Sequence, residues 1–155
     1  MTNSLSCRAG PEYLPQPRSQ AGKPRLLLAD DNSAVLEHVC GMLAKDFDIV
    51  AAATSGDAVL RDYKEVNPDL FVLDISMGSV GGLEVARTLR ANGNIAPVVF
   101  LTVHHEADFV KAALSCGGSA YVVKSHLTND LIPAIKAALS GKMFISPVLH
   151  SSSDV

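Results

Sequence analysis

The chain has 155 residues, of which 48% are hydrophobic and 19% are charged, a balance typical of a compact α/β protein that excludes an intrinsically disordered one. Its formal net charge of −3, without a run of lysines and arginines, argues against direct nucleic-acid binding. No apolar stretch has membrane-spanning length, no signal-peptide pattern opens the chain, and the three cysteines are widely spaced, so we expect a cytoplasmic protein with reduced thiols.

Residues 1–24 combine four prolines with serine, glutamine and few apolar residues. A segment of this composition cannot bury enough apolar surface to offset the entropy lost on ordering, so we predict a flexible N-terminal tail. Regular hydrophobic patterning begins at Arg25, and we interpret residues 25–145 as one domain. Residues 146–155 are interpreted as a C-terminal tail or the start of a linker.

Five short apolar runs alternate with five helical patterns inside this domain. The runs are "RLLLA" (25–29), "DIVAA" (48–52), "DLFVL" (69–73), "PVVFLT" (97–102) and "AYVVK" (120–124), and the helical stripes span 35–43, 59–66, 83–89, 109–114 and 131–139. Near-continuous apolar runs are typical of parallel strands covered on both faces. The alternation therefore predicts a doubly wound α/β fold with a five-stranded parallel sheet and five helices. Periodicity does not give strand order, but five strands fit the flavodoxin-like order 2-1-3-4-5.

Pro133 is an irregularity in the last helical pattern. A proline is harmless in a helix only within the first turn, because its missing N–H has no partner there. We therefore predict that the regular part of this helix begins near Asp130 and not at Thr128.

Polar side chains follow the apolar runs where each predicted strand ends. Asp30 and Asp31 follow the first run, Asp74 follows the third, Thr102 ends the fourth and Lys124 ends the fifth. Each residue alone is better explained as a cap, a turn former or a solvated side chain. In a parallel sheet, however, all these ends lie on one edge, and ligands bind where the strand order reverses. The joint placement therefore favours a shared site.

The chemistry of this set indicates phosphoryl transfer. Three clustered carboxylates repel one another, and Lys124 supplies only one compensating charge. A hard divalent cation such as Mg²⁺ suits oxygen ligands and leaves room for a phosphate oxygen. Because phosphoryl transfer depends mostly on positioning and charge neutralisation, and because a carboxylate can be the nucleophile, we predict that Asp74 forms an aspartyl-phosphate.

From Arg25 to about Pro147 the sequence resembles a response-regulator receiver domain of bacterial two-component systems. The motifs that carry the resemblance are "LLLADDNSAV", "PDLFVLDISM", "GGLEVARTLR", "VVFLTVHHE" and "GGSAYVVKS". The stretch "LIPAIKAALSGKMFISP" further resembles receivers of the NarL/FixJ type, which normally precede a helix-turn-helix DNA-binding domain.

The resemblance implies a role for each residue of the metal and phosphate site. Asp74 would be the phosphoacceptor. Asp31 and the main-chain carbonyl of Ser76 would bind Mg²⁺ directly, and Asp30 would act mainly through bound water. Lys124 would stabilise a phosphoryl oxygen.

The resemblance also implies a switch and two tuning positions. Thr102 would be drawn to the phosphate and Tyr121 would turn inward with it, although plain β packing explains Tyr121 nearly as well. Ser76 and His104 would lie beside the phosphoryl group and tune its lifetime, with a solvated loop as the simpler explanation of His104.

Two positions depart from the family pattern. Gly78 stands where the family usually has proline, and Gly81 stands where it usually has asparagine or aspartate. Glycine in place of a proline that fits costs about 0.4–1 kcal/mol through the unfolded ensemble. We therefore expect the loop 77–82 to be looser than usual.

The resemblance implies a signalling switch that catalyses only its own phosphorylation and dephosphorylation and regulates transcription in the full-length protein. Its expected partners are a sensor histidine kinase, a second copy bound through the fourth helix, fifth strand and fifth helix, and DNA only through an output domain absent from this chain, with no membrane partner.

Two alternative functions stay open. One is a receiver-fold module that signals by contact without phosphorylation. The other, less favoured, is a haloacid-dehalogenase-like phosphatase with an aspartate nucleophile; its D-x-D motif is broken here, because Asn32 stands two residues after Asp30.

Overall fold

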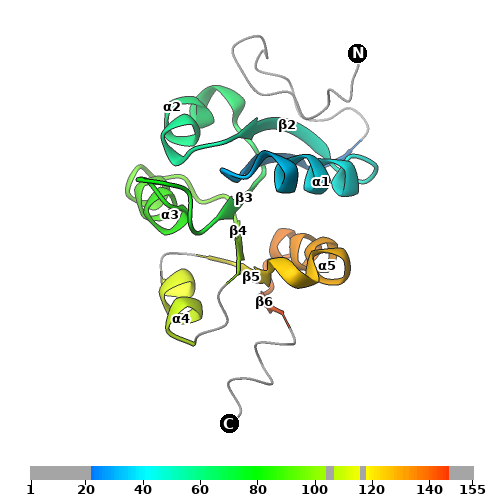
Figure 1. Cartoon of the computed structure of the whole chain (residues 1–155). Coiled ribbons are helices and arrows are strands. Elements are labelled where there is room, and N and C mark those ends of the chain that lie inside the picture. The colour runs from blue at the N-terminus through cyan, green and yellow to red at the C-terminus, as the bar shows by residue number, and fades with distance from the viewer. Residues whose placement is uncertain (1–21, 104–106, 116–117, 147–155) are drawn as a thin grey trace.

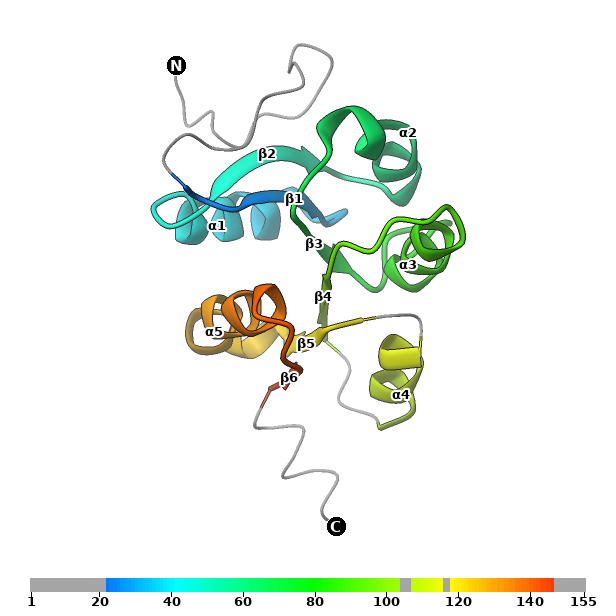
Figure 2. The same ribbon diagram turned by 180° about the vertical axis from the view of Figure 1, so that it is seen from behind.

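The computed structural model describes residues 22–103, 107–115 and 118–146 (Figure 1). In these ranges the chain forms one parallel sheet of order β2-β1-β3-β4-β5-β6. Helices α1 and α5 cover one face of the sheet, and α2, α3 and α4 cover the other, as both views show (Figures 1 and 2). The doubly wound fold and the order of the first five strands are thus confirmed.

The elements follow one another with short connections. The strands are β1 (Arg25–Ala29), β2 (Asp48–Ala53), β3 (Leu70–Asp74), β4 (Val98–Thr102), β5 (Ala120–Val123) and β6 (Phe144–Ile145). The helices are α1 (Ser33–Leu43), α2 (Gly56–Val66), α3 (Gly82–Ala91), α4 (Ala107–Ser115) and α5 (Leu127–Leu139), and a 3-10 turn (Lys124–His126) leads into α5.

The central strands are buried on both faces, which explains their unbroken apolar sequences. In β1, Leu26 and Leu28 belong to the core beneath α1 and α5, whereas Leu27 belongs to the core beneath α2 and α3. All residues of β1, β3, β4 and β5 are buried. Two hydrophobic cores therefore hold the sheet rigid from both sides and fix the positions of its strand ends.

A sixth strand extends the predicted sheet. Residues Phe144 and Ile145 pair in parallel with Ala120 and Tyr121 at the outer edge of β5. The sequence analysis did not predict this strand, since two residues carry no periodic pattern of their own.

The predicted start of the last helix is wrong. Helix α5 is regular from Leu127, so Pro133 lies well inside it rather than in the first turn. Leu127 is buried in the core beside α1, and this burial favours a helix that includes it. The proline removes the N–H that would bond to the carbonyl of Asn129, a residue at the exposed surface where water can hydrate that oxygen.

One further expectation concerns the redox state of the cysteines. Cys40, buried in α1, is disulfide-bonded, so the prediction of reduced thiols is wrong for this residue. Cys7 and Cys116 lie outside the described residues.

None of the helices in the described part of the chain is both long enough and apolar enough to cross a membrane.

Candidate phosphoacceptor site

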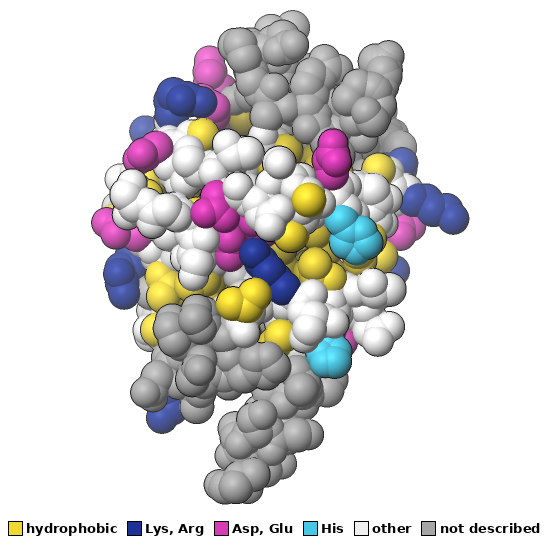
Figure 3. All heavy atoms as spheres, in the orientation of Figure 1, with side chains coloured by type: hydrophobic (Ala, Val, Ile, Leu, Met, Phe, Trp, Pro, Cys, Tyr) yellow, Lys and Arg dark blue, Asp and Glu magenta, His cyan; other side chains and the backbone are white. Residues whose placement is uncertain are grey.

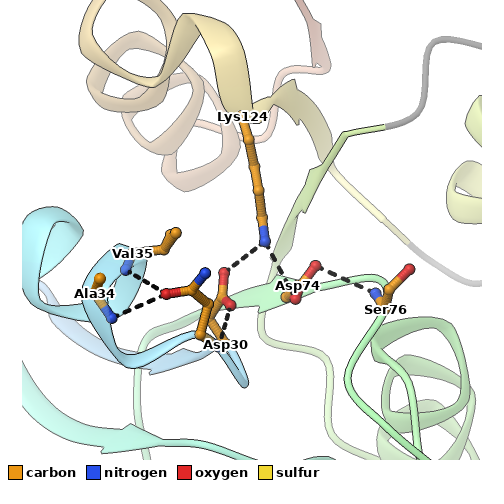
Figure 4. A network of polar contacts seen from close by, with 7 residues as sticks. Asp30, Ala34, Val35, Asp74, Ser76 and Lys124 are labelled. Atoms are coloured by element: carbon orange, nitrogen blue, oxygen red, sulfur yellow. Dashed lines mark hydrogen bonds and ion pairs between the residues drawn. The ribbon is translucent and has the colours of Figure 1, made fainter.

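The carboxyl ends of four strands bring the predicted site residues together. Asp30 directly follows β1, Asp74 ends β3, Thr102 ends β4 and Lys124 directly follows β5. Because β1, β3, β4 and β5 are parallel neighbours, these residues lie along one edge of the sheet. Figure 4 shows Lys124 extending from the end of β5 toward the two carboxylates.

Lys124 bridges two buried acids. Its Nζ lies 2.8 Å from Oδ2 of Asp30 and 3.2 Å from Oδ2 of Asp74. The side chains of Asp30 and Asp74 are only 2% and 5% exposed, and that of Lys124 is 17% exposed. The space-filling view shows acidic side chains beside a basic one near the middle of this face, with apolar side chains around them (Figure 3). Water therefore screens the charges of Asp30, Asp74 and Lys124 poorly, and the ionisation of each group is affected strongly by the other two.

Burial and charge shift the ionisation of both partners. Burial raises the pKa of Asp74 to about 6, the charge of Asp30 adds to the increase, and Lys124 with the N–H of Ser76 opposes it. Burial by itself lowers the pKa of Lys124, but the hydrogen bond to Asp30 and the charge of Asp74 outweigh it and raise that pKa above its usual value. Lys124 is therefore a permanent cation next to a carboxylate whose ionisation is held back by its surroundings.

Main-chain N–H groups orient both buried carboxylates. The N–H of Asn32 donates to Oδ1 of Asp30 over 2.8 Å, and the N–H of Ser76 donates to Oδ1 of Asp74 over 3.2 Å. Asn32 also caps α1, because its side-chain oxygen accepts from the N–H groups of Ala34 and Val35. The turn that starts α1 therefore also fixes the first acid of the site.

The two predicted switch residues are buried in neighbouring strands. Thr102 is 1% exposed and pairs in register with Val123, while Tyr121 is fully buried and pairs with Phe100. Thr102 and Asp74 end adjacent strands, so both residues lie at the same edge of the sheet. Ser76 is exposed directly after this edge, whereas His104 lies outside the described residues.

A family comparison decides what kind of domain carries this site. The model of the response regulator receiver domain matches residues 26–136, which is most of the chain. The chain belongs to the response-regulator receiver family. Receivers of this family are signalling switches in two-component systems, and the aligned region contains the Asp74 strand end, Thr102 and Lys124.

Individual relatives support the same assignment. The receiver is 33% identical over 126 residues to the response regulator GacA of Pseudomonas viridiflava, an alignment that covers 79% of this chain and 58% of that protein. It is 38% identical over 117 residues to the transcriptional regulatory protein PrrA of Mycobacterium bovis, covering 75% of this chain and 50% of PrrA. The chain thus spans between half and three fifths of the length of these curated relatives.

Solved structures place this receiver beside the NarL and LuxR regulators. A LuxR-family two-component response regulator from an Aurantimonas species superposes with a TM-score of 0.79 at 30% identity, covering 83% of this chain and 94% of that one. The signal receiver domain of NarL from Mycobacterium tuberculosis gives a TM-score of 0.73 at 26% identity, covering 77% and 98%. The NarL-type resemblance of the sequence is thereby confirmed.

The acidic cluster of this receiver fits a magnesium ion. One carboxylate oxygen from each of Asp30, Asp31 and Asp74 lies within 4.8 Å of the others, and Asp31 is exposed. Mg²⁺ holds oxygen ligands at about 2.0–2.1 Å and keeps several of its waters, so a donor set of this spread suits a partly hydrated ion.

Gly81 and Gly82 allow the loop after Asp74 to pack closely against the main chain at the end of β3. A Cβ on Gly81 would lie 2.5 Å from the carbonyl oxygen of Ile75, and a Cβ on Gly82 would lie 2.5 Å from that of Asp74. The N–H of Gly82 donates to the carbonyl of Ile75 over 3.0 Å. The start of α3 therefore rests directly on the main chain at the end of β3, a contact that the sequence alone does not predict. That this loop is looser than usual stays a prediction.

Proposed function

We propose that this receiver accepts a phosphoryl group on Asp74 from the phosphohistidine of a sensor histidine kinase, with Mg²⁺ bound by Asp30, Asp31, Asp74 and the carbonyl of Ser76. The observation that carries this proposal is the ammonium of Lys124, which lies 3.2 Å from Asp74. A fixed cation beside a buried carboxylate stabilises the charge that develops on phosphoryl oxygens, and phosphoryl transfer depends mainly on such positioning.

The transfer uses groups that the receiver already holds in place. A carboxylate oxygen of Asp74 forms a bond to phosphorus while the bond from phosphorus to the donor nitrogen breaks, and that nitrogen keeps the electron pair. Lys124 stays protonated and pairs with a phosphoryl oxygen of the product. Bound Mg²⁺ supplies further neutralisation of the charge on these oxygens. In hydrolysis, water forms the new bond to phosphorus and the carboxylate of Asp74 leaves.

The new phosphate would act on the two neighbouring strands. It adds negative charge and hydrogen-bond acceptors one strand away from the hydroxyl of Thr102, which would move toward it. Tyr121, buried two residues before the end of β5, would follow and alter the face formed by α4, β5 and α5. Ser76 and His104 would tune the lifetime of the phosphorylated state. This face would also bind a second copy of the receiver.

We further propose that this receiver is part of a longer protein that regulates transcription. Since the alignments cover only 58% of GacA and 50% of PrrA, and PrrA is named a transcriptional regulatory protein, this receiver would control transcription through an attached DNA-binding domain. It would work in the cytoplasm, where a histidine kinase can reach it. We also propose that the receiver domain spans residues 25–145 and that residues 1–24 form an N-terminal tail.

Intact mass spectrometry tests the proposed phosphorylation. Incubation with Mg²⁺ and acetyl phosphate should add the mass of one phosphate to the protein, and Asp74→Asn should abolish the addition because an amide is no nucleophile toward phosphorus. Asp46→Asn, which changes an exposed carboxyl away from the site, should leave it intact. No addition with any small phosphodonor would instead favour the contact-only module, and turnover of phosphomonoesters that survives Asp74→Asn would favour a phosphatase.

A further inference from the structure

The C-terminal strand attaches to the strand that carries Lys124 into the site. The N–H of Phe144 donates to the carbonyl of Ser119 over 3.2 Å, and the N–H of Ser146 donates to the carbonyl of Tyr121 over 3.0 Å. Ser146 is fully buried at the end of this segment. In the rear view, β6 lies beside β5 beneath α5 (Figure 2).

The side chain of Ser146 continues the hydrogen-bond ladder where β6 stops. The N–H of Val123 donates to Oγ of Ser146 over 3.1 Å. In a continued parallel pair a main-chain carbonyl would accept this N–H, and here the hydroxyl oxygen accepts it instead. Val123 and Ser146 are both buried, so water could not easily replace the hydroxyl. Loss of the hydroxyl would leave an unsatisfied main-chain N–H in the interior, which is unfavourable.

Val123 occupies the position from which Lys124 reaches the acids. It is the last residue of β5, it pairs with Thr102 on β4, and Lys124 follows it directly. The ammonium of Lys124 then meets Asp30 at 2.8 Å and Asp74 at 3.2 Å. A shift of the Val123 peptide would move the base of the lysine side chain, and displacements on the order of 1 Å in such sites slow reactions strongly.

We propose that Ser146 is a positioning residue for Lys124. Its hydroxyl fixes the end of β5, and this end holds the ammonium against Asp30 and Asp74. Within the described part of the chain, Ser146 is hydrogen-bonded to Val123 and Tyr121 of β5 and not to the acids, so its hydroxyl acts on Lys124 through Val123. The functional consequence rests on the proposed phosphorylation of Asp74.

A double-mutant cycle tests this coupling. The rate of phosphorylation by acetyl phosphate with Mg²⁺ is followed by intact mass in the unmodified protein, Ser146→Ala, Lys124→Ala and the double variant. We expect Ser146→Ala to slow the reaction on the order of 10-fold. In the Lys124→Ala background the same change should cause no further slowing, because the group it positions is absent. Equal slowing in both backgrounds, or none in folded Ser146→Ala, would overturn the proposal.

Two sets of controls separate positioning from general destabilisation. Ser115→Ala makes the same chemical change at an exposed hydroxyl that donates to the carbonyl of Ala112 within α4, and it should leave the rate unchanged. Ser146→Thr and Ser146→Val are nearly equal in volume and differ in the hydroxyl, so only the threonine variant should keep the rate. This pair replaces Ser146→Ala if that variant does not fold, and equal rates for the pair would argue against a role of the hydroxyl.

A structural readout keeps the inference independent of the proposed function. If the unmodified protein takes up no phosphate, the proposed function fails, but a crystal structure of Ser146→Ala still reports on Lys124. We expect its Nζ to leave Asp74 in that variant. An ammonium that stays at about the present 3.2 Å would overturn the positioning role whatever the phosphorylation result.

Discussion

The surroundings of Asp74 disfavour the charged form of its carboxyl group. Burial and the neighbouring charge of Asp30 raise its pKa from an ordinary value near 3.8 to about 6 in the metal-free protein. A carboxyl with a higher pKa in the folded chain binds its proton more tightly there than in the unfolded chain. Its contribution to stability is therefore fully present below about pH 4 and is lost as the pH rises through about 6.

Asp74→Asn should therefore stabilise the metal-free protein at neutral pH. Above pH 6 the free energy of unfolding should exceed that of the unmodified protein by about 1–3 kcal/mol, because the amide needs no charge in the buried site. The difference should shrink toward zero near pH 4. Urea denaturation with a chelator at pH 4, 5, 6 and 7 measures it. The exposed Asp46→Asn serves as control, and a difference that does not vary with pH would contradict this explanation.

The sequence predicts which residues lie on this edge of the sheet better than it predicts how deeply each of them is buried. The sequence could place Asp30, Asp74, Thr102 and Lys124 on one edge, because each follows or ends a short, nearly continuous apolar run of the kind typical of parallel strands. The sequence does not say which of two adjacent acids is buried, since both follow the same strand. The structure buries Asp30, whose carboxylate accepts from a main-chain N–H and from Lys124, and leaves Asp31 exposed.

At the scale of elements, strand and helix type followed from local pattern, whereas ends and short pieces depended on distant contacts. Helix α5 begins earlier than its proline predicted, because Leu127 packs into the core beside α1. The two residues of β6 form a strand only because the edge of β5 accepts them. Tertiary packing decided both, and neither has a signal in the local sequence.

The loop between β3 and α3 gives the clearest prediction at this scale. Gly78 has φ of +64°, which proline cannot adopt, so the proline usual in the family does not fit this loop as it stands. Gly78→Pro should therefore lower the free energy of unfolding by more than about 1 kcal/mol rather than raise it. Urea denaturation measures the change. A stabilised Gly78→Pro variant would mean that the loop takes the usual family conformation.

A matched pair of alanine variants controls for the general effect of replacing glycine. Gly78→Ala should destabilise by about 1–2 kcal/mol, because left-handed backbone is unfavourable for alanine even though open space surrounds the added Cβ. Gly41→Ala, in the interior of α1 and equally free of neighbours, should stabilise by about 0.5–1 kcal/mol. Opposite signs for the same chemical change would locate the effect in the backbone of the loop.

The whole fold assembles a charge arrangement that no part of the chain has alone. Asp30 and Asp31 follow the first strand and Asp74 ends the third, so the acidic cluster exists only when β1 and β3 are paired. Lys124 arrives from β5, on the far side of β4. Repulsion among these three carboxylates therefore opposes folding of the whole domain. A cation that binds between them reduces this repulsion and should raise the stability of the whole domain.

Magnesium should accordingly stabilise the entire receiver. A ligand that binds only the folded chain adds about 2.7 kcal/mol at a concentration 100 times its dissociation constant, so the melting temperature should rise steadily with Mg²⁺ at constant ionic strength. Asp31→Asn should reduce this rise while leaving the metal-free fold intact, because Asp31 is exposed and contributes to the cluster without being packed in the core. Asp46→Asn should keep the full rise. An equal rise with sodium chloride of matched ionic strength would show that general screening, and not a bound ion, relieves the repulsion among the three acids.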